Sequence, residues 1–145
     1  KYLKEELDAA GSNELYCDIK ASVALIDNNA HTLQYSGINQ DMIMFQDGKM
    51  KIIEGDSDED FDMLKADKFD VSEDDTFYLF SNGFYNQSNI DGVKFSKEKF
   101  EELLKAVQPM NMSEQESFLS QTIEDWIGDG GMSDDISVIG FKLKL

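Results

Sequence analysis

Two short polar segments in this sequence carry side chains that could bind a metal ion. Ser81-Asn82-Gly83 follows an aromatic, β-favouring run, and Ser133-Asp134-Asp135 precedes a run that alternates apolar and polar residues. Carboxylate and amide oxygens at strand ends suit hard divalent cations such as Mg²⁺ and Mn²⁺, which prefer oxygen ligands and keep several waters. By residue type alone, an Asp-Asp pair is more typical of a solvated turn than of a metal site.

The chain offers little for nucleophilic catalysis by a cysteine or a serine. Cys17 is the only cysteine and His31 is the only histidine, so a Cys-His or Ser-His catalytic pair is not expected. Cys17 falls in an apolar-polar alternation and is interpreted as a core residue. A single cysteine cannot form a disulfide within the chain, which suits a reducing compartment.

Residues 54–75 are the most acidic part of the chain, with eleven Asp or Glu. With Asp56 as the first position, the first three acidic positions of a helix-loop-helix calcium motif are filled. The pattern then fails, because Phe61 stands where the turn needs glycine and Asp67 stands where a bidentate glutamate is required. The segment is therefore interpreted as a solvated acidic loop.

The composition is that of a soluble globular protein of about one domain. The 145 residues are 41% apolar and 30% charged, and no apolar run is long enough for a membrane helix. A net charge of −17 would repel a phosphate backbone, so a nucleic-acid partner is not expected. Without an apolar run of membrane length, membrane contact by this segment is not expected either. The sequence opens at Lys1, without Met and inside an amphipathic stretch, which suggests a piece of a longer protein.

The first half of the chain is expected to form a helix end and two β-hairpins. Leu3 and Leu7, four residues apart, predict the end of a helix over residues 2–10 that stops at Gly11. Period-two alternation, together with an Asp47-Gly48 pair that allows positive φ angles, predicts the hairpins. The four expected strands are Cys17–Asp27, Thr32–Ser36, Met42–Phe45 and Met50–Ile53.

The second half is expected to contain two strands and two helices. Thr76–Phe80 predicts a buried strand, and Ile136–Leu143 predicts the last one. Ser96 is expected to cap a helix that ends near Val107, and a capping box over Ser113–Glu116 is expected to open the next helix. That helix should end at the glycines of residues 128–131, and its expected inward-facing residues are Leu119, Ile123, Trp126 and Ile127.

This order of elements predicts an α+β fold, with a largely antiparallel β-sheet and helices packed on one face. Hairpins dominate, and no strand-helix-strand alternation of the doubly wound kind occurs. Residues 1–145 contain no internal repeat and no Pro- or Ser-rich linker. They are therefore interpreted as a single domain or part of one.

Four motifs in order resemble the stage II sporulation protein E-like (SpoIIE) branch of the metal-dependent serine/threonine protein phosphatases of the type 2C superfamily. Tyr35–Gln40, with the strand and Asp-Gly turn after it, resembles the family's strand–"GxN"–strand passage. Asp75–Phe84 resembles its "GDT-hydrophobic-(S/T)DG" signature, and Phe95–Trp126 resembles the paired helices that follow. Ser133–Ile139 resembles the closing "DD-hydrophobic-(S/T)-hydrophobic" motif. The resemblance implies the C-terminal part of an αββα sandwich domain that lacks its N-terminal strands.

The same resemblance implies a mechanism and assigns roles to residues. In the family, two Mn²⁺ or Mg²⁺ ions held mainly by aspartates activate a bridging water for attack on phosphoserine or phosphothreonine. Asp134 matches the metal aspartate of the closing motif, and Gly83 matches the glycine beside the second metal position. Asp135, Ser81 and Ser133 are expected to support the two turns.

Two departures from the family pattern bear on activity. Asn82 stands where the family has a metal aspartate, and a neutral amide there is expected to lower the affinity for cations. The family's first Gly-Asp motif, whose aspartate bridges both metals, has no equivalent, because Gly55-Asp56 falls in the acidic segment and Gly128-Asp129 at a helix end. Mn²⁺ or Mg²⁺ binding is therefore expected to be weak or absent, and this chain alone is expected to be inactive.

Two functions stay open on the sequence. The first is a bacterial Mn²⁺- or Mg²⁺-dependent phosphoserine/phosphothreonine phosphatase of a signalling pathway, incomplete or degenerate in this chain. The second is a non-catalytic phosphatase-like module that binds a protein partner or relays a signal. The expected partner is a phosphoprotein or a regulatory protein in the cytoplasm, and an uncovered sheet surface could also drive self-association.

Overall fold

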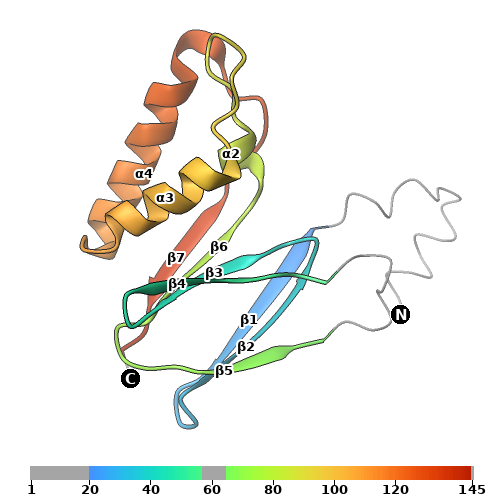
Figure 1. The fold of residues 1–145 in the computed structure, drawn as a ribbon, viewed down its shortest axis with the longest axis vertical. Coiled ribbons are helices and arrows are strands. Elements are labelled where there is room, and N and C mark those ends of the chain that lie inside the picture. The colour runs from blue at the N-terminus through green and yellow to red at the C-terminus, as the bar shows by residue number, and fades with distance from the viewer. Residues whose placement is uncertain (1–19, 57–64, 145) are drawn as a thin grey trace, which may run out of the picture. The chain divides into compact units, whose positions relative to one another are not determined.

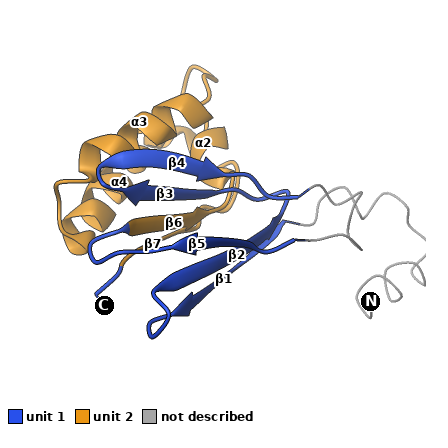
Figure 2. Cartoon of the chain, turned by 60° about the horizontal axis from the view of Figure 1, so that its bottom comes forward, with its two compact units in different colours: residues 1–75, 143–145 blue, residues 76–142 orange. Residues whose placement is uncertain are grey.

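The computed structural model describes residues 20–56 and 65–144. The chain divides into two compact units: residues 1–75 with 143–145 make up unit 1, and residues 76–142 make up unit 2 (Figure 2). The helix end predicted over residues 2–10, its stop at Gly11, and Cys17 lie outside the described residues. The assignment of residues 1–145 to a single domain stays a prediction.

Unit 1 contains a three-stranded antiparallel sheet in the order β1-β2-β5 (Figure 1). Its strands are β1 (Ala21–Asp27), β2 (Thr32–Ile38) and β5 (Asp67–Asp70). The central strand β2 buries Leu33 and Tyr35. The predicted β1–β2 hairpin is confirmed, and the Asp27 carboxylate holds its turn by accepting from the N–H groups of Asn29 and Ala30, each at 3.0 Å.

Strand β5 corrects the interpretation of residues 54–75 as a loop. It pairs antiparallel with β2, with Leu33 opposite Phe69. Its other three residues are exposed and charged, so the sequence shows no run of apolar residues there. The strand forms nonetheless because its pairing uses backbone groups, and one half-buried Phe69 is enough to set which face it turns inward.

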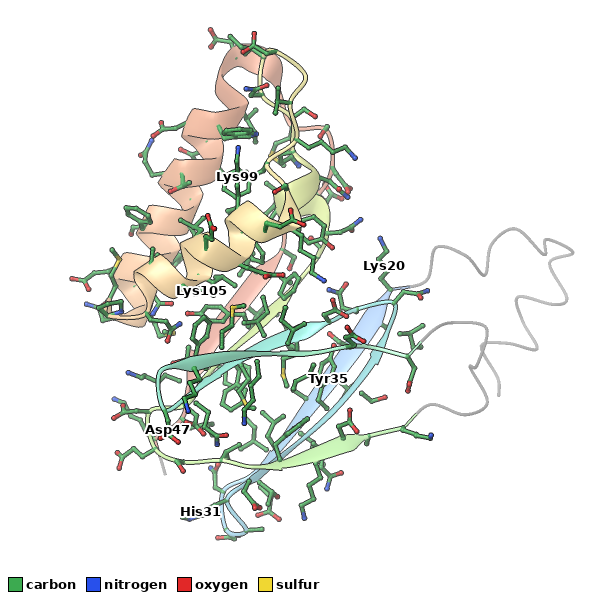
Figure 3. All side chains as sticks on the ribbon, in the orientation of Figure 1. Lys20, His31, Tyr35, Asp47, Lys99 and Lys105 are labelled. Atoms are coloured by element: carbon green, nitrogen blue, oxygen red, sulfur yellow. The ribbon has the colours of Figure 1, made fainter. Side chains whose placement is uncertain are left out.

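Unit 1 also contains the predicted second hairpin, formed by β3 (Met42–Gln46) and β4 (Lys49–Ile53). Asp47 and Gly48 have φ angles of 51° and 71°, the positive values that a two-residue type I′ turn requires. The hairpin predicted from this Asp-Gly pair is confirmed. Asp47 lies at the tip of its turn, as His31 does in the β1–β2 turn (Figure 3).

Unit 2 contains two paired antiparallel strands and the helices of the chain's second half (Figure 1). In chain order its elements are β6 (Thr76–Phe80), α2 (Gly83–Asn86), α3 (Lys97–Val107), α4 (Met112–Ile127), the 3₁₀ helix η3 (Gly128–Gly130) and β7 (Val138–Lys142). The last strand was predicted to begin at Ile136 and begins two residues later. The Ser137 N–H bonds to the Ser81 hydroxyl rather than to a backbone carbonyl, which interrupts the ladder at this point.

An aromatic cluster joins β6, α2 and α3 within unit 2. The Phe100 side chain is fully buried, and its ring centroid lies 5.1 Å from that of Phe80 and 4.7 Å from that of Phe84. Phe84 also meets Phe95 edge to face at 5.4 Å, and Phe95 meets Trp126 of α4 at 5.3 Å. These contacts fix the short helix α2, and with it the end of β6, against the two long helices.

A buried hydrogen-bond network crosses unit 2 from β6 to the ends of α3 and α4. The Tyr78 hydroxyl donates to Gln115 Oε1 at 2.6 Å and accepts from Gln108 Nε2 at 2.7 Å. Gln115 Nε2 donates in turn to the Met110 carbonyl at 3.0 Å. Burial raises the pKa of the Tyr78 hydroxyl to about 12, so it stays protonated and keeps donating through the whole physiological pH range.

Both long helices lie where the sequence predicted them, but the cap of α4 does not. Ser96 caps α3 as expected, with its hydroxyl accepting from the Lys99 N–H at 3.4 Å. The capping box predicted over Ser113–Glu116 is wrong by two residues. Asn111 is the N-cap of α4: its side chain accepts from the Glu114 N–H at 3.0 Å, and the Glu114 carboxylate accepts from the Asn111 N–H at 2.9 Å. Asn111 and Glu114 have the same three-residue spacing as the predicted pair, so this box equally fits the pattern.

This difference between the two caps yields a stability test. Asn111→Ala removes the side-chain cap of α4 and is expected to lower the free energy of unfolding by about 1 kcal/mol. Ser113→Ala is the matched control, because Ser113 is exposed inside the first turn and its loss should stay within about 0.5 kcal/mol. Urea unfolding of both variants measures the difference. A larger loss for Ser113→Ala would contradict the observed cap.

The antiparallel strands and grouped helices confirm the predicted α+β fold class. No helix in residues 20–56 or 65–144 combines the length and the apolar composition that crossing a bilayer requires. Strand β1 leaves Val23 and Leu25 exposed at 66% and 61%. Self-association through an uncovered sheet surface stays a prediction.

Candidate functional site

The two polar turns singled out in the sequence meet at one end of the β6–β7 pair. Phe80, the last residue of β6, lies opposite Val138, the first residue of β7, so the residues just beyond them emerge at the same end. The Ser81 N–H donates to the Ser137 carbonyl at 2.8 Å, and the Ser137 N–H donates to Ser81 Oγ at 3.0 Å. The Ser81 hydroxyl also donates to the Asp135 carbonyl at 3.1 Å. Ser81 therefore joins both turns, and its role in supporting a metal site stays a prediction.

Gly83 is the point where the two backbones approach most closely. A Cβ atom at this position would lie 1.9 Å from the Asp135 carbonyl oxygen and 2.7 Å from its carbonyl carbon. Real Cβ atoms do not approach backbone atoms so closely, and a backbone carbonyl cannot turn aside as the end of a flexible side chain can. Glycine is therefore required here by the contact with Asp135, which the resemblance alone did not explain.

Asn82 occupies the residue before the first turn of α2. Its backbone has φ −68° and ψ −10°, and its side chain makes no capping hydrogen bond to the helix. The Asn82 carbonyl accepts from the Asn86 N–H at 3.0 Å. The backbone thus closes the short helix, and the half-buried Asn82 amide is not used as its cap. The sequence treated residues 81–83 as a turn and did not anticipate α2.

Asp134 and Asp135 lie exposed in the turn that precedes β7. Asp134 Oδ1 accepts from the Asp135 N–H at 2.9 Å, which fixes one edge of the Asp134 carboxylate. The Asp135 carbonyl is the group that receives the Ser81 hydroxyl and abuts Gly83. Asp135 therefore contacts the opposite turn through its backbone, and Asp134 presents a carboxylate at the surface beside it.

Gln87, which the sequence analysis did not single out, connects the same two turns through its side-chain amide. Its side chain is fully buried. Gln87 Nε2 donates to the Gly83 carbonyl at 3.0 Å and to the Asp134 carbonyl at 2.7 Å. Gln87 Oε1 accepts from the Ser133 N–H at 2.9 Å and from the Ser133 hydroxyl at 3.1 Å. No local pattern marks such a residue, because its partners on the second turn stand more than forty positions away in the sequence.

The donor set at this end of the β6–β7 pair suits only part of a metal centre. Asp134, Asp135 and the Asn82 amide offer oxygen ligands of the kind that Mg²⁺ and Mn²⁺ prefer. Across residues 20–56 and 65–144, however, no group of three or more His, Cys, Asp or Glu is placed to hold a metal ion. By residue type these oxygens suit a single, largely hydrated cation, and the described residues do not make up a two-cation centre.

The chain has clear relatives among families and solved structures. The sequence model of the family Stage II sporulation protein E (SpoIIE) matches residues 5–144. The SiaA-PP2C domain of Pseudomonas aeruginosa is similar with a TM-score of 0.76 and 19% identity, over 86% of this chain and 52% of that one. The phosphatase domain of the cell fate determinant SpoIIE from Bacillus subtilis, presoaked with Mn, is similar with a TM-score of 0.68 and 13% identity, over 90% of this chain and 58% of that one.

A third similar structure is PppA, a key regulatory component of T6SS in Pseudomonas aeruginosa, with a TM-score of 0.61 and 13% identity, over 98% of this chain and 64% of that one. No curated protein matches this chain. The chain thus spans between about half and two thirds of the length of these three structures. At such low identity the likeness establishes the phosphatase fold, and the family match confirms the resemblance inferred from the four sequence motifs.

Proposed function

This chain belongs to the stage II sporulation protein E (SpoIIE) family, and we propose that it forms the part of a protein phosphatase domain that carries the Asn82 and Asp134 turns. The proposed substrate class is a phosphoserine or phosphothreonine protein, and the proposed setting is a cytoplasmic signalling pathway in a bacterium. The single observation that supports this assignment is the junction of the two turns through Ser81, Gly83 and Gln87. Two segments about fifty residues apart in the sequence are held together there by hydrogen bonds from both backbones.

Within this proposal, Asp134 holds the cation and the Asn82 amide oxygen assists it. A bound Mn²⁺ or Mg²⁺ supplies a Lewis acid and lowers the pKa of a coordinated water. The residues of this chain orient the ligands: the Asp135 N–H holds one Asp134 oxygen, and Ser81 holds the Asp135 carbonyl. Ser133 and Gly83 fix the flanks of the two turns through Gln87.

We do not propose that this chain is catalytically active by itself. Phosphoryl transfer in such sites depends on two cations about 3.5–4 Å apart that stabilise the attacking and the leaving oxygens. The described residues supply ligands for fewer than two cations, and the Asn82 amide contributes no negative charge. We therefore propose that the chain binds Mn²⁺ weakly and does not hydrolyse phosphate esters at a useful rate.

This proposal is tested with the purified 145-residue chain and p-nitrophenyl phosphate in MnCl₂. The expected hydrolysis rate equals that of the buffer with Mn²⁺, and the Asp134→Ala variant should give the same rate. Robust Mn²⁺-dependent turnover that Asp134→Ala abolishes would show a complete active site and overturn the proposed incompleteness.

A non-catalytic signalling module is the second candidate, and Asn82 is the feature that favours it. A neutral amide in place of a carboxylate weakens cation binding while leaving the fold of the turn intact. Such a module would bind a phosphoprotein or a regulatory protein without turning it over. In a longer form of this protein that contains a Gly-Asp motif upstream, high activity with Asn82 in place would favour the enzyme. Inactivity of both that form and its Asn82→Asp variant would favour the module.

A further inference from the structure

We propose that Gln87 is a positioning residue: its side-chain amide holds the Asp134 turn against the Asn82-Gly83 turn and so sets the cation affinity of Asp134. The predicted effect on cation affinity rests on the proposed function. The predicted position of the Asp134 turn rests on the hydrogen bonds of Gln87 alone. Gln87 would touch neither the cation nor a phosphate. Its effect would reach the site through Gly83, Ser133 and the Asp134 backbone.

The hydrogen-bond inventory of Gln87 is complete and specific for glutamine. An amide side chain has two N–H donors and one carbonyl oxygen with two lone pairs. Both donors are used, on the carbonyls of Gly83 and Asp134, and both lone pairs are used, by the N–H and hydroxyl of Ser133. The orientation of the amide follows from its partners, because backbone carbonyls can only accept and the Ser133 N–H can only donate.

The backbone of Gln87 is fixed independently of its side chain. The Gln87 carbonyl accepts from the Phe95 N–H at 2.9 Å and from the Trp126 indole Nε1 at 3.3 Å. Trp126 is itself held by Phe95 and by Lys99, whose Nζ lies 4.1 Å from the indole ring centroid. The amide thus projects from a rigid support, so its four bonds can impose a position on the exposed Asp134 turn instead of following it.

A purely structural role is the alternative, and Gln115 provides the matched control. Gln115 is also a buried glutamine, exposed only 3%. Its side chain accepts from the Tyr78 hydroxyl and donates to the Met110 carbonyl, and neither partner belongs to a polar turn. Gln87→Met and Gln115→Met each remove a buried amide from unit 2 and replace it with an apolar side chain of similar length. Only the first should alter the Asp134 turn.

The test follows Mn²⁺ binding residue by residue, because a chain with a net charge of −17 also attracts cations elsewhere. Amide signals of Asp134 and Asp135 in ¹⁵N-labelled protein should broaden first as MnCl₂ is added to the wild-type chain. In Gln87→Met the Mn²⁺ concentration for half broadening should rise about tenfold or more, as is typical when a partner that orients a metal ligand is lost. In Gln115→Met it should change by less than about twofold. The Trp126 indole signal, which reports the backbone of Gln87, should persist in both.

A second readout needs no cation and tests the position of the Asp134 turn separately from cation binding. Nuclear Overhauser contacts between Gly83 and the Asp135–Ile136 segment should be lost in Gln87→Met and kept in Gln115→Met. Retention of these contacts and of wild-type broadening in Gln87→Met would overturn the positioning role and leave the proposed function standing. If the wild-type chain shows no selective broadening at Asp134, the cation site of the proposed function fails. Loss of the Gly83 contacts in Gln87→Met would then still uphold the positioning of the turn, and their retention would overturn it.

Discussion

Replacement of Gly83 by alanine is expected to lower the free energy of unfolding of the chain by about 3 kcal/mol, the upper part of the usual range for inserting a methyl group into a filled site. The added Cβ would fall 1.9 Å from the Asp135 carbonyl oxygen, so one of the two turns must move. The Ser81 bond to Asp135 and the Gln87 bonds to Gly83 and Asp134 would stretch together with that movement.

Gly130→Ala is the matched control for this loss. A Cβ at Gly130 would find its nearest neighbour, Ile90 Cγ2, at 3.9 Å, which is ordinary van der Waals contact. That variant should therefore stay within about 1 kcal/mol of the wild type. Urea unfolding of both variants provides the measurement. Equal stability of Gly83→Ala and the wild type would mean that the two turns do not meet as described.

Replacement of Asn82 by aspartate is expected to strengthen Mn²⁺ binding at Asp134 by about tenfold. A unit charge about 4 Å from a divalent cation contributes about 2 kcal/mol in water before salt screening, and screening leaves part of that. The change from amide to carboxylate keeps the size of the side chain, and Asn82 uses no side-chain cap that the change could break. Titration with MnCl₂, read from the amide signals of Asp134 and Asp135, measures the effect.

Asn86→Asp adds the same charge at the other end of α2 (Gly83–Asn86) and serves as the control for long-range attraction. Its effect on the Mn²⁺ affinity should not exceed about threefold, because the attraction between two charges falls with their separation and salt weakens it further. If Asn82→Asp and Asn86→Asp raise the affinity equally, the Asn82 side chain does not face the cation, and the assignment of Asn82 to the site is wrong.

Local sequence signals predicted the elements of this fold wherever the signal and the structure depend on neighbouring residues. The Asp47-Gly48 pair predicted its hairpin because the turn requires the positive φ angles that this pair allows. Ser96 predicted the start of α3 because a cap bonds within one turn of its own helix. The same reasoning misplaced the cap of α4, because Asn111 and Ser113 each stand three residues before a glutamate and the pattern cannot rank them.

Features that depend on distant partners were not visible in the sequence. β5 is a strand because β2 offers it a backbone edge, and its charged residues carry no apolar alternation. Gln87 looks like any polar loop residue, and its role follows only from where residues 133 and 134 lie. The family resemblance assigned residues of both polar turns to metal positions, and the β6–β7 pairing with Ser81 and Gly83 gives the physical cause of their meeting.

Anomalous diffraction at the manganese absorption edge, from crystals of this chain soaked in MnCl₂, tests most directly whether the joined turns hold a cation. The account predicts an anomalous peak within coordination distance, about 2.0–2.3 Å, of an Asp134 carboxylate oxygen and on the side that faces Asn82. A peak confined to other acidic residues would contradict it, and so would a peak at Asp134 on the side that faces away from Asn82.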